Sequence, residues 1–311
     1  MPTALFSDRP ENWDRYRAPL LAAFAEKGVA VDLLRETDAP EQVDYVIYSP
    51  NGGLQDFSRF PNLKAVLSLW AGVEKIEGNP TIRAPLCRMV DDGLTMGMVE
   101  WVTGHILRHH LGMDAHICGQ NGVWGNGSVP PLARDRKVGF LGLGALGAAC
   151  AQAAAGLNFD VAGWSRSPKT LDGVATFAGP SGLETVLERS DILVLLLPDT
   201  AATRDILDAD ALARMPRGAV VINPGRGPLI DDEALLAALD SRQISHATLD
   251  VFRQEPLPAD HPFWAHPAVT VTPHIASETR PESAARAIAE NIWRGETGQP
   301  FVHVVDRKAG Y

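Results

Sequence analysis

The sequence predicts an α/β protein built from two Rossmann-like domains, one flavodoxin-like and one dinucleotide-binding, with a cleft between them. Three observations predict this fold class. Strand-like and helical segments alternate along most of the chain. A glycine-rich turn at 142–147 separates a strand-like segment from a helical one. The length of 311 residues suits two domains better than one, and a cleft between two domains is a common place for a ligand.

The first hundred residues alternate between the two kinds of segment. Residues 11–27 form an amphipathic helical pattern that ends at Gly28, and 97–111 form a further helical stretch. The predicted strands are 3–8, 29–34, 45–50 and 63–70. This alternation is typical of parallel βαβ units.

A second βαβ series begins at residue 137. The predicted strands are 137–141, 159–164, 191–197, 219–223, 245–250 and 268–272, and helices fill the gaps at about 145–156, 182–188, 208–214 and 231–240. Six parallel strands with crossover helices make a complete doubly wound sheet. A last helix follows at 281–294, so this domain is predicted to be inserted into the first. Residues 1–96 with 278–311 would form the substrate (catalytic) domain, and 97–277 the dinucleotide-binding domain.

Composition limits the class of partner. Hydrophobic residues make up 45% of the chain and charged residues 21%, as in an ordinary globular protein. A net charge of −10 argues against nucleic acid or an anionic membrane surface as a partner. The longest strongly apolar run, 192–197, is too short to span a bilayer. Three cysteines without CxxC spacing and no signal-like N-terminus predict a cytoplasmic location.

The segment "GLGALG" at 142–147 predicts a dinucleotide site. Gly142 would make the tight turn, Gly144 would let a pyrophosphate approach, and Gly147 would allow close packing of helix and strand. The helix that begins there presents free N–H groups to a phosphate. Glycines also occur in many other strand–helix turns, so the motif gains its weight from the strands that follow it.

The end of the second strand in this series indicates which dinucleotide is bound. An NAD site usually has an acidic residue there, which binds the ribose 2′-hydroxyl. This chain has Ser165, Arg166 and Ser167 instead, with Lys169 nearby. A hydroxyl beside a guanidinium suits a 2′-phosphate, so NADPH is the preferred cofactor and NADH a possible one. The alternative is a solvated basic turn without a ligand.

Three charged residues follow later strands of the same sheet. Arg226 lies between two glycines in "NPGRGPLID", Glu255 in "DVFRQEPLP" and His274 in "TPHIAS". Because ligands bind beyond the carboxyl ends of such strands, the three side chains are expected to converge. A histidine can protonate a ketone oxygen, a carboxylate can orient that histidine, and a guanidinium can grip a substrate carboxylate. These groups require no metal.

Each of the three also has a structural interpretation. His274 could be an ordinary hydrogen-bonded loop residue, and Glu255 could belong to a solvated turn. Arg226 could bond the C-terminus of a nearby helix. Their combination behind a nucleotide-binding turn favours catalysis.

These segments carry a resemblance. "GLGALG", "LPDTAATRDILD", "VINPGRGPLIDDEALLAAL", "LDVFRQEPLP" and "TPHIAS" resemble the signature segments of the D-isomer-specific 2-hydroxyacid dehydrogenases, over roughly residues 60–300. Within that family, "GWSRSPK" and "PHIASETRPE" are most similar to the NADPH-dependent glyoxylate/hydroxypyruvate reductases.

The resemblance implies roles for particular residues. It implies that Arg226, Glu255 and His274 are the catalytic set, that Thr203 and Asp250 approach the cofactor, and that homodimers form through the cofactor domains and an arm at about 110–135. The full predicted cofactor set is Gly142, Gly144, Ala145, Leu146, Gly147, Ser165, Arg166, Ser167, Lys169, Leu197, Pro198, Thr203, Pro224, Asp250 and His274.

One segment departs from the family pattern. "SLWAGVEKI" at 68–76 resembles the loop that holds the substrate carboxylate, usually G-A-G-V-D, so the amides of Ala71 and Gly72 are expected to bind it. Trp70 replaces a frequent glycine, and it could either narrow the pocket or pack in the core. Trp101 and Trp124 are further candidate pocket walls, with core or dimer packing the preferred interpretation.

The predicted function is NADPH-dependent reduction of small 2-oxo acids, glyoxylate and hydroxypyruvate first. One alternative is another D-2-hydroxyacid dehydrogenase, acting on phosphoglycerate or a bulkier 2-ketoacid. A second alternative is a non-enzymatic scaffold that senses a dinucleotide.

Overall fold

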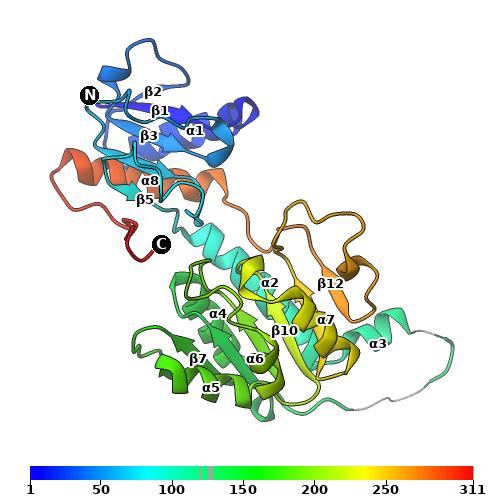
Figure 1. Ribbon diagram of the computed structural model, residues 1–311. Helices are drawn as coiled ribbons and strands as arrows, with labels where there is room; N and C mark the ends of the chain where they lie inside the picture. Colours follow the sequence, from blue (N-terminus) through cyan, green and yellow to red (C-terminus); the bar gives the residue numbers. More distant parts are fainter. Residues whose placement is uncertain (120, 125–128, 311) are drawn as a thin grey trace. The chain divides into compact units, whose positions relative to one another are not determined.

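The protein divides into two compact units in the computed structural model, which describes residues 1–119, 121–124 and 129–310. One unit combines Met1–Leu94 with the segment from Glu278 onward, and the other is Thr95–Ser277 (Figure 1). The second unit is thus inserted into the chain of the first. Helix α2 (Asp92–His110) begins in the first unit and continues into the second.

The first unit is a parallel five-stranded sheet with the order β2-β1-β3-β4-β5. This 2-1-3-4-5 order is the flavodoxin-like one, so the prediction for this unit is confirmed. Its elements are β1 (Thr3–Ser7), α1 (Pro10–Glu26), β2 (Asp32–Leu34), β3 (Tyr45–Tyr48), β4 (Ala65–Ser68), β5 (Leu86–Cys87) and α8 (Pro281–Glu296), with short 3₁₀ turns at Pro40–Gln42 and Pro50–Gly52.

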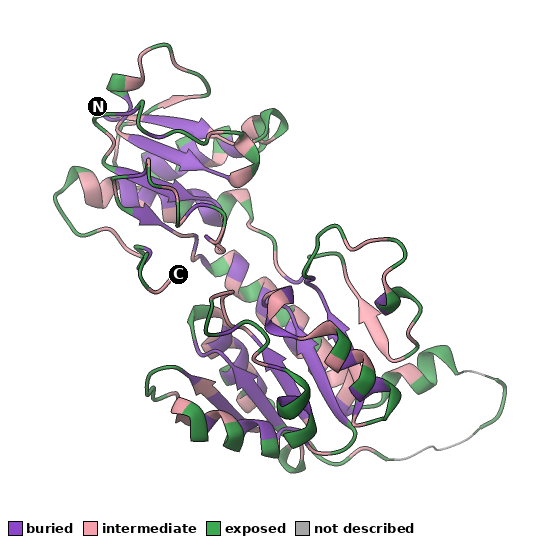
Figure 2. Ribbon diagram, in the orientation of Figure 1, coloured by how far each residue is buried: buried purple, intermediate pink, exposed green. Residues whose placement is uncertain are grey.

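Burial on both faces explains the apolar strands of this unit. Every residue of β3 and β4 is buried (Figure 2). Helices α1 and α8 pack against each other and share a core cluster with the alternate residues Tyr45, Ile47 and Leu67. Loop side chains, among them Phe57 and Phe60, join the core on the opposite face. Strands covered on both faces are expected to be continuously apolar.

Helix α2 begins earlier than the pattern predicted, at Asp92 rather than at residue 97. The buried carboxylate of Asp91 accepts the N–H of Leu94 at 2.6 Å and the hydroxyl of Ser283 at 2.8 Å. An aspartate that accepts an amide of the first turn stabilises a helix start. The cap lies outside the apolar stripe, and a search for helical periodicity therefore misses it.

The second unit is a parallel seven-stranded sheet with the order β12-β11-β10-β9-β6-β7-β8. Counted from β6, this is the doubly wound order 3-2-1-4-5-6 with a seventh strand added. Its elements are β6 (Lys137–Leu141), α4 (Ala145–Gly156), β7 (Asp160–Ser165), β8 (Ala175–Ala178), α5 (Gly179–Arg189), β9 (Ile192–Leu195), α6 (Ala209–Arg214), β10 (Ala219–Asn223), α7 (Asp232–Asp240), β11 (Ile244–Leu249) and β12 (Val269–Val271). Short 3₁₀ turns lie at Ala133–Asp135, Gly227–Leu229 and Pro262–Trp264.

The predicted count of six strands in this sheet was wrong. The seventh, β8, is a four-residue edge strand that pairs with β7, and none of its residues is buried. Such a short, unburied segment has no apolar pattern to reveal it. Helix α3 (Met113–Cys118) has no buried residue either, and the sequence did not indicate it for the same reason. Strand β5 is buried, but its two residues are too few to form a pattern.

The strand order places a topological switch point between β6 and β9. After β6 the chain adds strands toward one edge of the sheet, and after β9 it adds strands toward the other edge. Core clusters of side chains cover both faces of the sheet. Its central strands are accordingly buried (Figure 2). Ligands of doubly wound sheets bind at the carboxyl edge beside the switch point. The loops that follow β6, β7, β9, β10, β11 and β12 therefore define the candidate site.

Candidate active site

The turn after β6 needs glycine at two positions. Gly142 has φ +103°, and a Cβ there would collide with the carbonyl of Leu196. A Cβ on Gly147 would collide with the carbonyl of Gly142 itself. The first glycine thus allows the turn, and the last allows α4 to start close against the sheet.

The middle glycine faces open space. Gly144 is the N-cap of α4, and a Cβ there would meet nothing within 4 Å. Gly144 and Ala145 are exposed, and Leu146 is half-buried. A helix N-terminus with free amides and room in front of it fits the pyrophosphate of a dinucleotide. NADPH is therefore compatible with this turn on steric and electrostatic grounds.

The end of β7 carries the cations that were predicted to select the cofactor. Arg166, Ser167 and Lys169 are exposed, and the Lys169 ammonium donates to the carbonyl of Leu143 at 2.6 Å, inside the glycine-rich turn. Ser165 is buried, and its hydroxyl donates to the carbonyl of Ser167 at 2.8 Å. In this arrangement Arg166 and Lys169 offer positive charge beside the turn, whereas the Ser165 hydroxyl shapes the loop.

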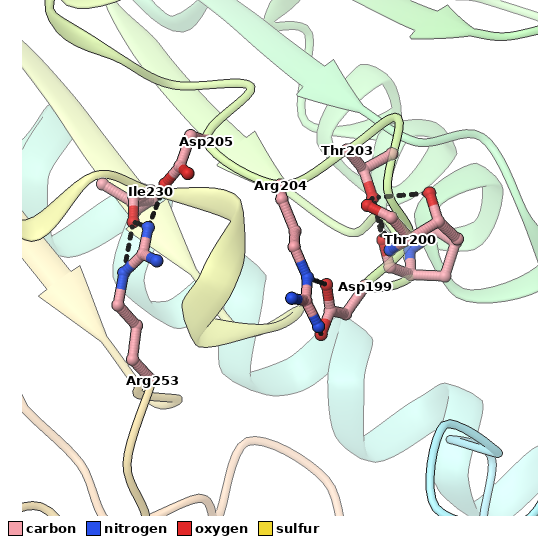
Figure 3. A network of polar contacts seen from close by, with 8 residues as sticks. Asp199, Thr200, Thr203, Arg204, Asp205, Ile230 and Arg253 are labelled. Atoms are coloured by element: carbon pink, nitrogen blue, oxygen red, sulfur yellow. Dashed lines mark hydrogen bonds and ion pairs between the residues drawn. The ribbon is translucent and has the colours of Figure 1, made fainter.

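The loop after β9 is held by the hydroxyl of Thr203 (Figure 3). This hydroxyl accepts the N–H of Thr200 at 2.9 Å and lies 2.6 Å from the carbonyl of Pro198, to which it donates. Thr203 is buried, and Leu197 and Pro198 are half-buried. The loop is therefore internally hydrogen-bonded where it was predicted to approach the cofactor.

Arg226 stands on a loop that is fixed on both sides. Asn223, the last residue of β10, accepts the N–H of Gly225 at 3.0 Å and donates its side-chain amide to the carbonyl of Arg226 at 2.9 Å. Pro224 is buried, and the 3₁₀ turn Gly227–Leu229 follows. An asparagine that bonds its own loop in this way is a common turn device. The half-buried Arg226 guanidinium donates to the carbonyl of Gly225 at 2.7 Å.

His274 and Glu255 form the central pair. His274 Nδ1 lies 2.7 Å from Glu255 Oε2, and Glu255 Oε1 accepts the N–H of Phe252 at 3.0 Å. A carboxylate can only accept, so Nδ1 carries the proton of this bond and Nε2 is the nitrogen left for another partner. A carboxylate-oriented imidazole is the arrangement expected of a general acid–base.

The pair is tuned electrostatically. The hydrogen bond to Glu255 raises the pKa of His274, against the opposing effects of burial and of the Arg226 charge. Burial alone would raise the pKa of Glu255, but the hydrogen bonds from His274 and Phe252 together with nearby positive charge lower it. Arg226 contributes to both shifts, so the structure brings the three predicted catalytic side chains into one electrostatic cluster.

The comparisons agree with this geometry. Residues 103–276 match the sequence profile described as "D-isomer specific 2-hydroxyacid dehydrogenase, NAD binding domain". The chain belongs to the D-isomer specific 2-hydroxyacid dehydrogenase family. It is 39% identical over 258 residues to a glyoxylate/hydroxypyruvate reductase A of Yersinia enterocolitica, covering 80% of this chain and 82% of that protein. A reductase of the same name from Serratia proteamaculans is 40% identical over the same length.

Solved structures of this dehydrogenase family share the fold. A D-isomer specific 2-hydroxyacid dehydrogenase from Xanthobacter autotrophicus Py2, in complex with NADPH and MES, has a TM-score of 0.90 and 40% identity, covering 100% of this chain and 99% of that one. An NADPH-dependent glyoxylate/hydroxypyruvate reductase from Sinorhizobium meliloti, in complex with NADP and sulfate, has a TM-score of 0.88 and 36% identity, covering 100% of both chains.

Asp250, implied by the family resemblance to approach the cofactor, is fully buried. One carboxylate oxygen accepts the hydroxyl of Thr272 at 2.6 Å and the N–H of Ile275 at 2.9 Å, and the other accepts the N–H of Ala276 at 2.9 Å. The backbone of His274 between these partners has φ +54°, a strained value for a non-glycine residue. In this dehydrogenase Asp250 therefore fixes the turn that presents the imidazole, and its approach to the cofactor stays a prediction.

The predicted carboxylate loop lies in the other compact unit. Trp70, Ala71 and Gly72 are half-buried, and the carbonyl of Trp70 accepts the N–H of Met89 at 3.0 Å. The Trp70 ring packs against the core of its unit, with the Lys75 ammonium 5.7 Å from the ring centroid. These contacts favour the core interpretation of Trp70 over the pocket interpretation.

The other two tryptophans differ from each other in exposure. Trp101 is half-buried and lies against His105, with ring centroids 4.2 Å apart and ring planes tilted by 53°, which agrees with core packing. Trp124 is 98% exposed. Residues 120 and 125–128 of the predicted arm lie outside the described residues.

Two residues that shape this site were missed in the sequence. Asn223 holds the Arg226 loop, and the signal for it was an asparagine at a strand end followed by Pro-Gly. Arg253 lies two positions before Glu255, and no motif or spacing in the sequence indicates its contacts. Its contacts across three loops could be seen only in the fold.

Proposed function

We propose that this chain reduces small 2-oxo acids to 2-hydroxy acids with NADPH preferred over NADH, and that glyoxylate and hydroxypyruvate are its first substrates. The observation that carries the proposal is the 2.7 Å pair of His274 and Glu255 at the carboxyl edge of the sheet that bears the glycine-rich turn. The names of the relatives, glyoxylate/hydroxypyruvate reductase A, support the substrate class.

Each side chain has a role in this proposal. His274 protonates the keto oxygen through Nε2, since Nδ1 is engaged by Glu255. Glu255 keeps the imidazole in that orientation and stabilises its charged form. Arg226 grips the substrate carboxylate and polarises the neighbouring carbonyl. The amides of Ala71 and Gly72 stay predicted carboxylate-binding groups of the first unit. NADPH, when bound, supplies the hydride to the keto carbon.

NADPH is the preferred cofactor in this proposal because of Arg166 and Lys169. Both are exposed beside the glycine-rich turn, where an additional phosphate would gain charge-assisted hydrogen bonds. Related structures were solved with NADPH or NADP bound, which supports the same preference. The pyrophosphate would be held by the glycine-rich turn, through Gly142, Gly144, Ala145, Leu146 and Gly147.

We also propose that the protein is a cytoplasmic homodimer, with the unit 278–311 plus 1–96 binding substrate and 97–277 binding cofactor. Large apolar side chains are exposed along the predicted arm, namely Leu111, Met113, Ile117, Val123, Trp124, Val129 and Leu132. Exposed apolar patches of this kind often mark interfaces.

The cysteines agree with the proposed cytoplasmic location. Cys87, Cys118 and Cys150 are free, as is usual in a reducing compartment. None of the helices over the described ranges combines the length and apolar character that a bilayer-spanning helix requires.

The test is turnover by the purified protein. A panel of 2-oxo acids that includes glyoxylate, hydroxypyruvate, 3-phosphohydroxypyruvate and a branched 2-ketoacid would be offered with NADPH and with NADH. We expect the highest kcat/KM for glyoxylate or hydroxypyruvate with NADPH. A clear preference for a bulkier acid would indicate the substrate specificity of another D-2-hydroxyacid dehydrogenase. Binding of NADPH without turnover of any acid would support a non-enzymatic sensing scaffold.

A further inference from the structure

Arg253 joins three loops at the carboxyl edge of the second unit. Its Nε donates to the carbonyl of Ile230 at 3.1 Å, and its Nη2 donates to the same carbonyl and pairs with Asp205. Figure 3 shows the guanidinium held between Ile230 and Asp205. The planar guanidinium of Arg253 thus contacts two segments, the loop after β9 and the residues that follow the Arg226 loop. The backbone of Arg253 belongs to a third segment, the loop that carries Glu255.

The two segments that Arg253 grips are themselves paired. Asp205 donates its N–H to the carbonyl of Pro228 at 2.9 Å, and Leu207 donates to the carbonyl of Leu229 at 3.1 Å. The 3₁₀ turn that contains Pro228 and Leu229 begins directly after Arg226. A contact with Ile230 therefore acts on the same short segment that holds Arg226.

The loops of Arg226 and Glu255 also meet through their backbones. A Cβ on Gly227 would overlap the carbonyl of Phe252 and the amide of Arg253, so only glycine permits the approach. Phe252 in turn donates its N–H to Glu255 Oε1 at 3.0 Å. A shift of the Phe252–Arg253 backbone would thus be passed directly to the carboxylate that orients His274.

We propose that Arg253 is a positioning residue that fixes the Glu255 loop against the Arg226 loop, so that Glu255 stays in hydrogen-bond contact with His274. The inference rests on the proposed function, because it assigns Arg253 to the same reaction. The Arg253 and Asp205 side chains are 38% and 50% exposed, so their ion pair contributes little to global stability. The effect of Arg253 is on geometry, and activity is the quantity that reports it.

A neighbouring ion pair shows the contrast. Arg204 pairs with Asp199 at 2.8 and 3.1 Å, and both residues belong to the loop after β9 (Figure 3). That pair ties one loop to itself. Arg253 ties its loop to two others, and this difference assigns the positioning role to Arg253.

The experiment compares Arg253→Gln, Arg253→Lys and Asp205→Asn with the unmodified enzyme. It measures kcat with glyoxylate across a range of pH, and KM for NADPH by varying NADPH at saturating glyoxylate. We expect Arg253→Gln to lower kcat roughly 5–20-fold, a fraction of the value of a correctly placed general acid. KM for NADPH should not change. The alkaline limb of the pH profile should move to lower pH, because His274 loses part of the contact that raises its pKa. Arg253→Lys should recover part of the loss, since it restores one donor but not the fork.

Arg214→Gln is the matched control. Arg214 is an exposed arginine at the end of α6, and it pairs with Glu184 of α5 at 3.3 Å. This variant should keep the kcat and the pH profile of the unmodified enzyme. Thermal melting of every variant separates loss of fold from loss of positioning. If Arg253→Gln does not fold, Asp205→Asn is the deciding variant, and we expect it to show a smaller fall in kcat and a smaller shift of the alkaline limb to lower pH.

A normal kcat and pH profile in Arg253→Gln, or in Asp205→Asn where that variant decides, would overturn the positioning role. That result is distinct from failure of the proposed function. If His274→Ala abolishes turnover while Arg253→Gln is unaffected, the proposed function stands and only this inference fails. If the unmodified protein turns over no 2-oxo acid, the proposed function itself fails, and the inference fails with it.

Discussion

Nδ1 of His274 lies 2.7 Å from a carboxylate oxygen of Glu255, although the two residues are 19 positions apart in the chain. The contact takes up one ring nitrogen and leaves Nε2 for a substrate oxygen. It also raises the pKa of the imidazole, so that more of the protonated form is present near neutral pH.

His274→Ala removes the proposed general acid. We expect kcat for glyoxylate to fall by about 10²–10⁴-fold, the usual contribution of a positioned acid. The dissociation constant of NADPH, measured by fluorescence titration, should change little, because the predicted phosphate contacts lie on other loops. Near-normal kcat in this variant would remove His274 from the chemistry.

Glu255→Gln should shift the pH dependence of the reaction. The raised pKa of His274 keeps the proton on the imidazole to higher pH, so reduction should decline as pH rises through that value. The amide cannot stabilise the charged ring, and the decline should therefore begin at lower pH. Reduction rates measured from acidic to alkaline pH give the comparison, and identical profiles would contradict the assignment.

The same pair predicts a pH-dependent term in stability. The raised His274 pKa contributes stability that is fully present below about pH 6.5, the ordinary value, and is lost as pH rises through the folded-state value. The lowered Glu255 pKa contributes stability present above about pH 4.5 and lost as pH falls through its folded-state value. The difference in unfolding free energy between the unmodified protein and Glu255→Gln should therefore be largest between these two pH values. A difference that does not vary with pH would show that the two groups are uncoupled.

Arg226→Lys should lower activity, although it is a conservative substitution. A lysine keeps the charge but lacks the planar two-pronged donor that matches a carboxylate. The loss should be seen in kcat/KM for the oxo acid, with the affinity for NADPH retained. Kinetics like those of the unmodified enzyme would take Arg226 out of the substrate site.

Cofactor selection should depend on Arg166. A hydrogen bond to a charged group is worth roughly 1.5–3 kcal/mol, and solvent keeps an exposed site near the lower end. We therefore expect NADPH to exceed NADH in kcat/KM by at least about tenfold. Arg166→Ala should reduce that ratio through KM for NADPH, with KM for NADH unchanged. Equal use of both cofactors by the unmodified enzyme would identify the 165–169 turn as a solvated basic loop.

Two glycines of the same helix should respond oppositely to alanine. Gly147→Ala places a methyl group against the carbonyl of Gly142, so we expect a lower Tm and loss of NADPH binding. Gly156→Ala is the control, because a Cβ there meets nothing within 4 Å. Its Tm should be unchanged or higher, as alanine favours a helix by about 1 kcal/mol over glycine. Equal melting temperatures for the two variants would refute the packing argument.

Elements with a strong apolar pattern could be predicted from the sequence. Strands β6 and β10 and helix α4 have the predicted bounds of 137–141, 219–223 and 145–156. Their signals are local, because burial on both faces makes a strand continuously apolar and small residues mark a helix packed close to the sheet. Segments without such a pattern, β5, β8 and α3, were recognised only in the fold.

The sequence by itself determined which chemical groups the site contains: a glycine turn after a strand, and an arginine, a glutamate and a histidine after later strands of the same sheet. Their convergence followed from one rule, that parallel strands end at the same edge. The tertiary structure alone decided how each group is held. Asp250 fixes the strained turn of His274, and Arg253 spans loops 23 and 48 residues away. These contacts join residues that are distant in the chain. A hydrogen bond between distant residues produces no periodic pattern in the sequence, because its distance and angle are set by the folded backbone.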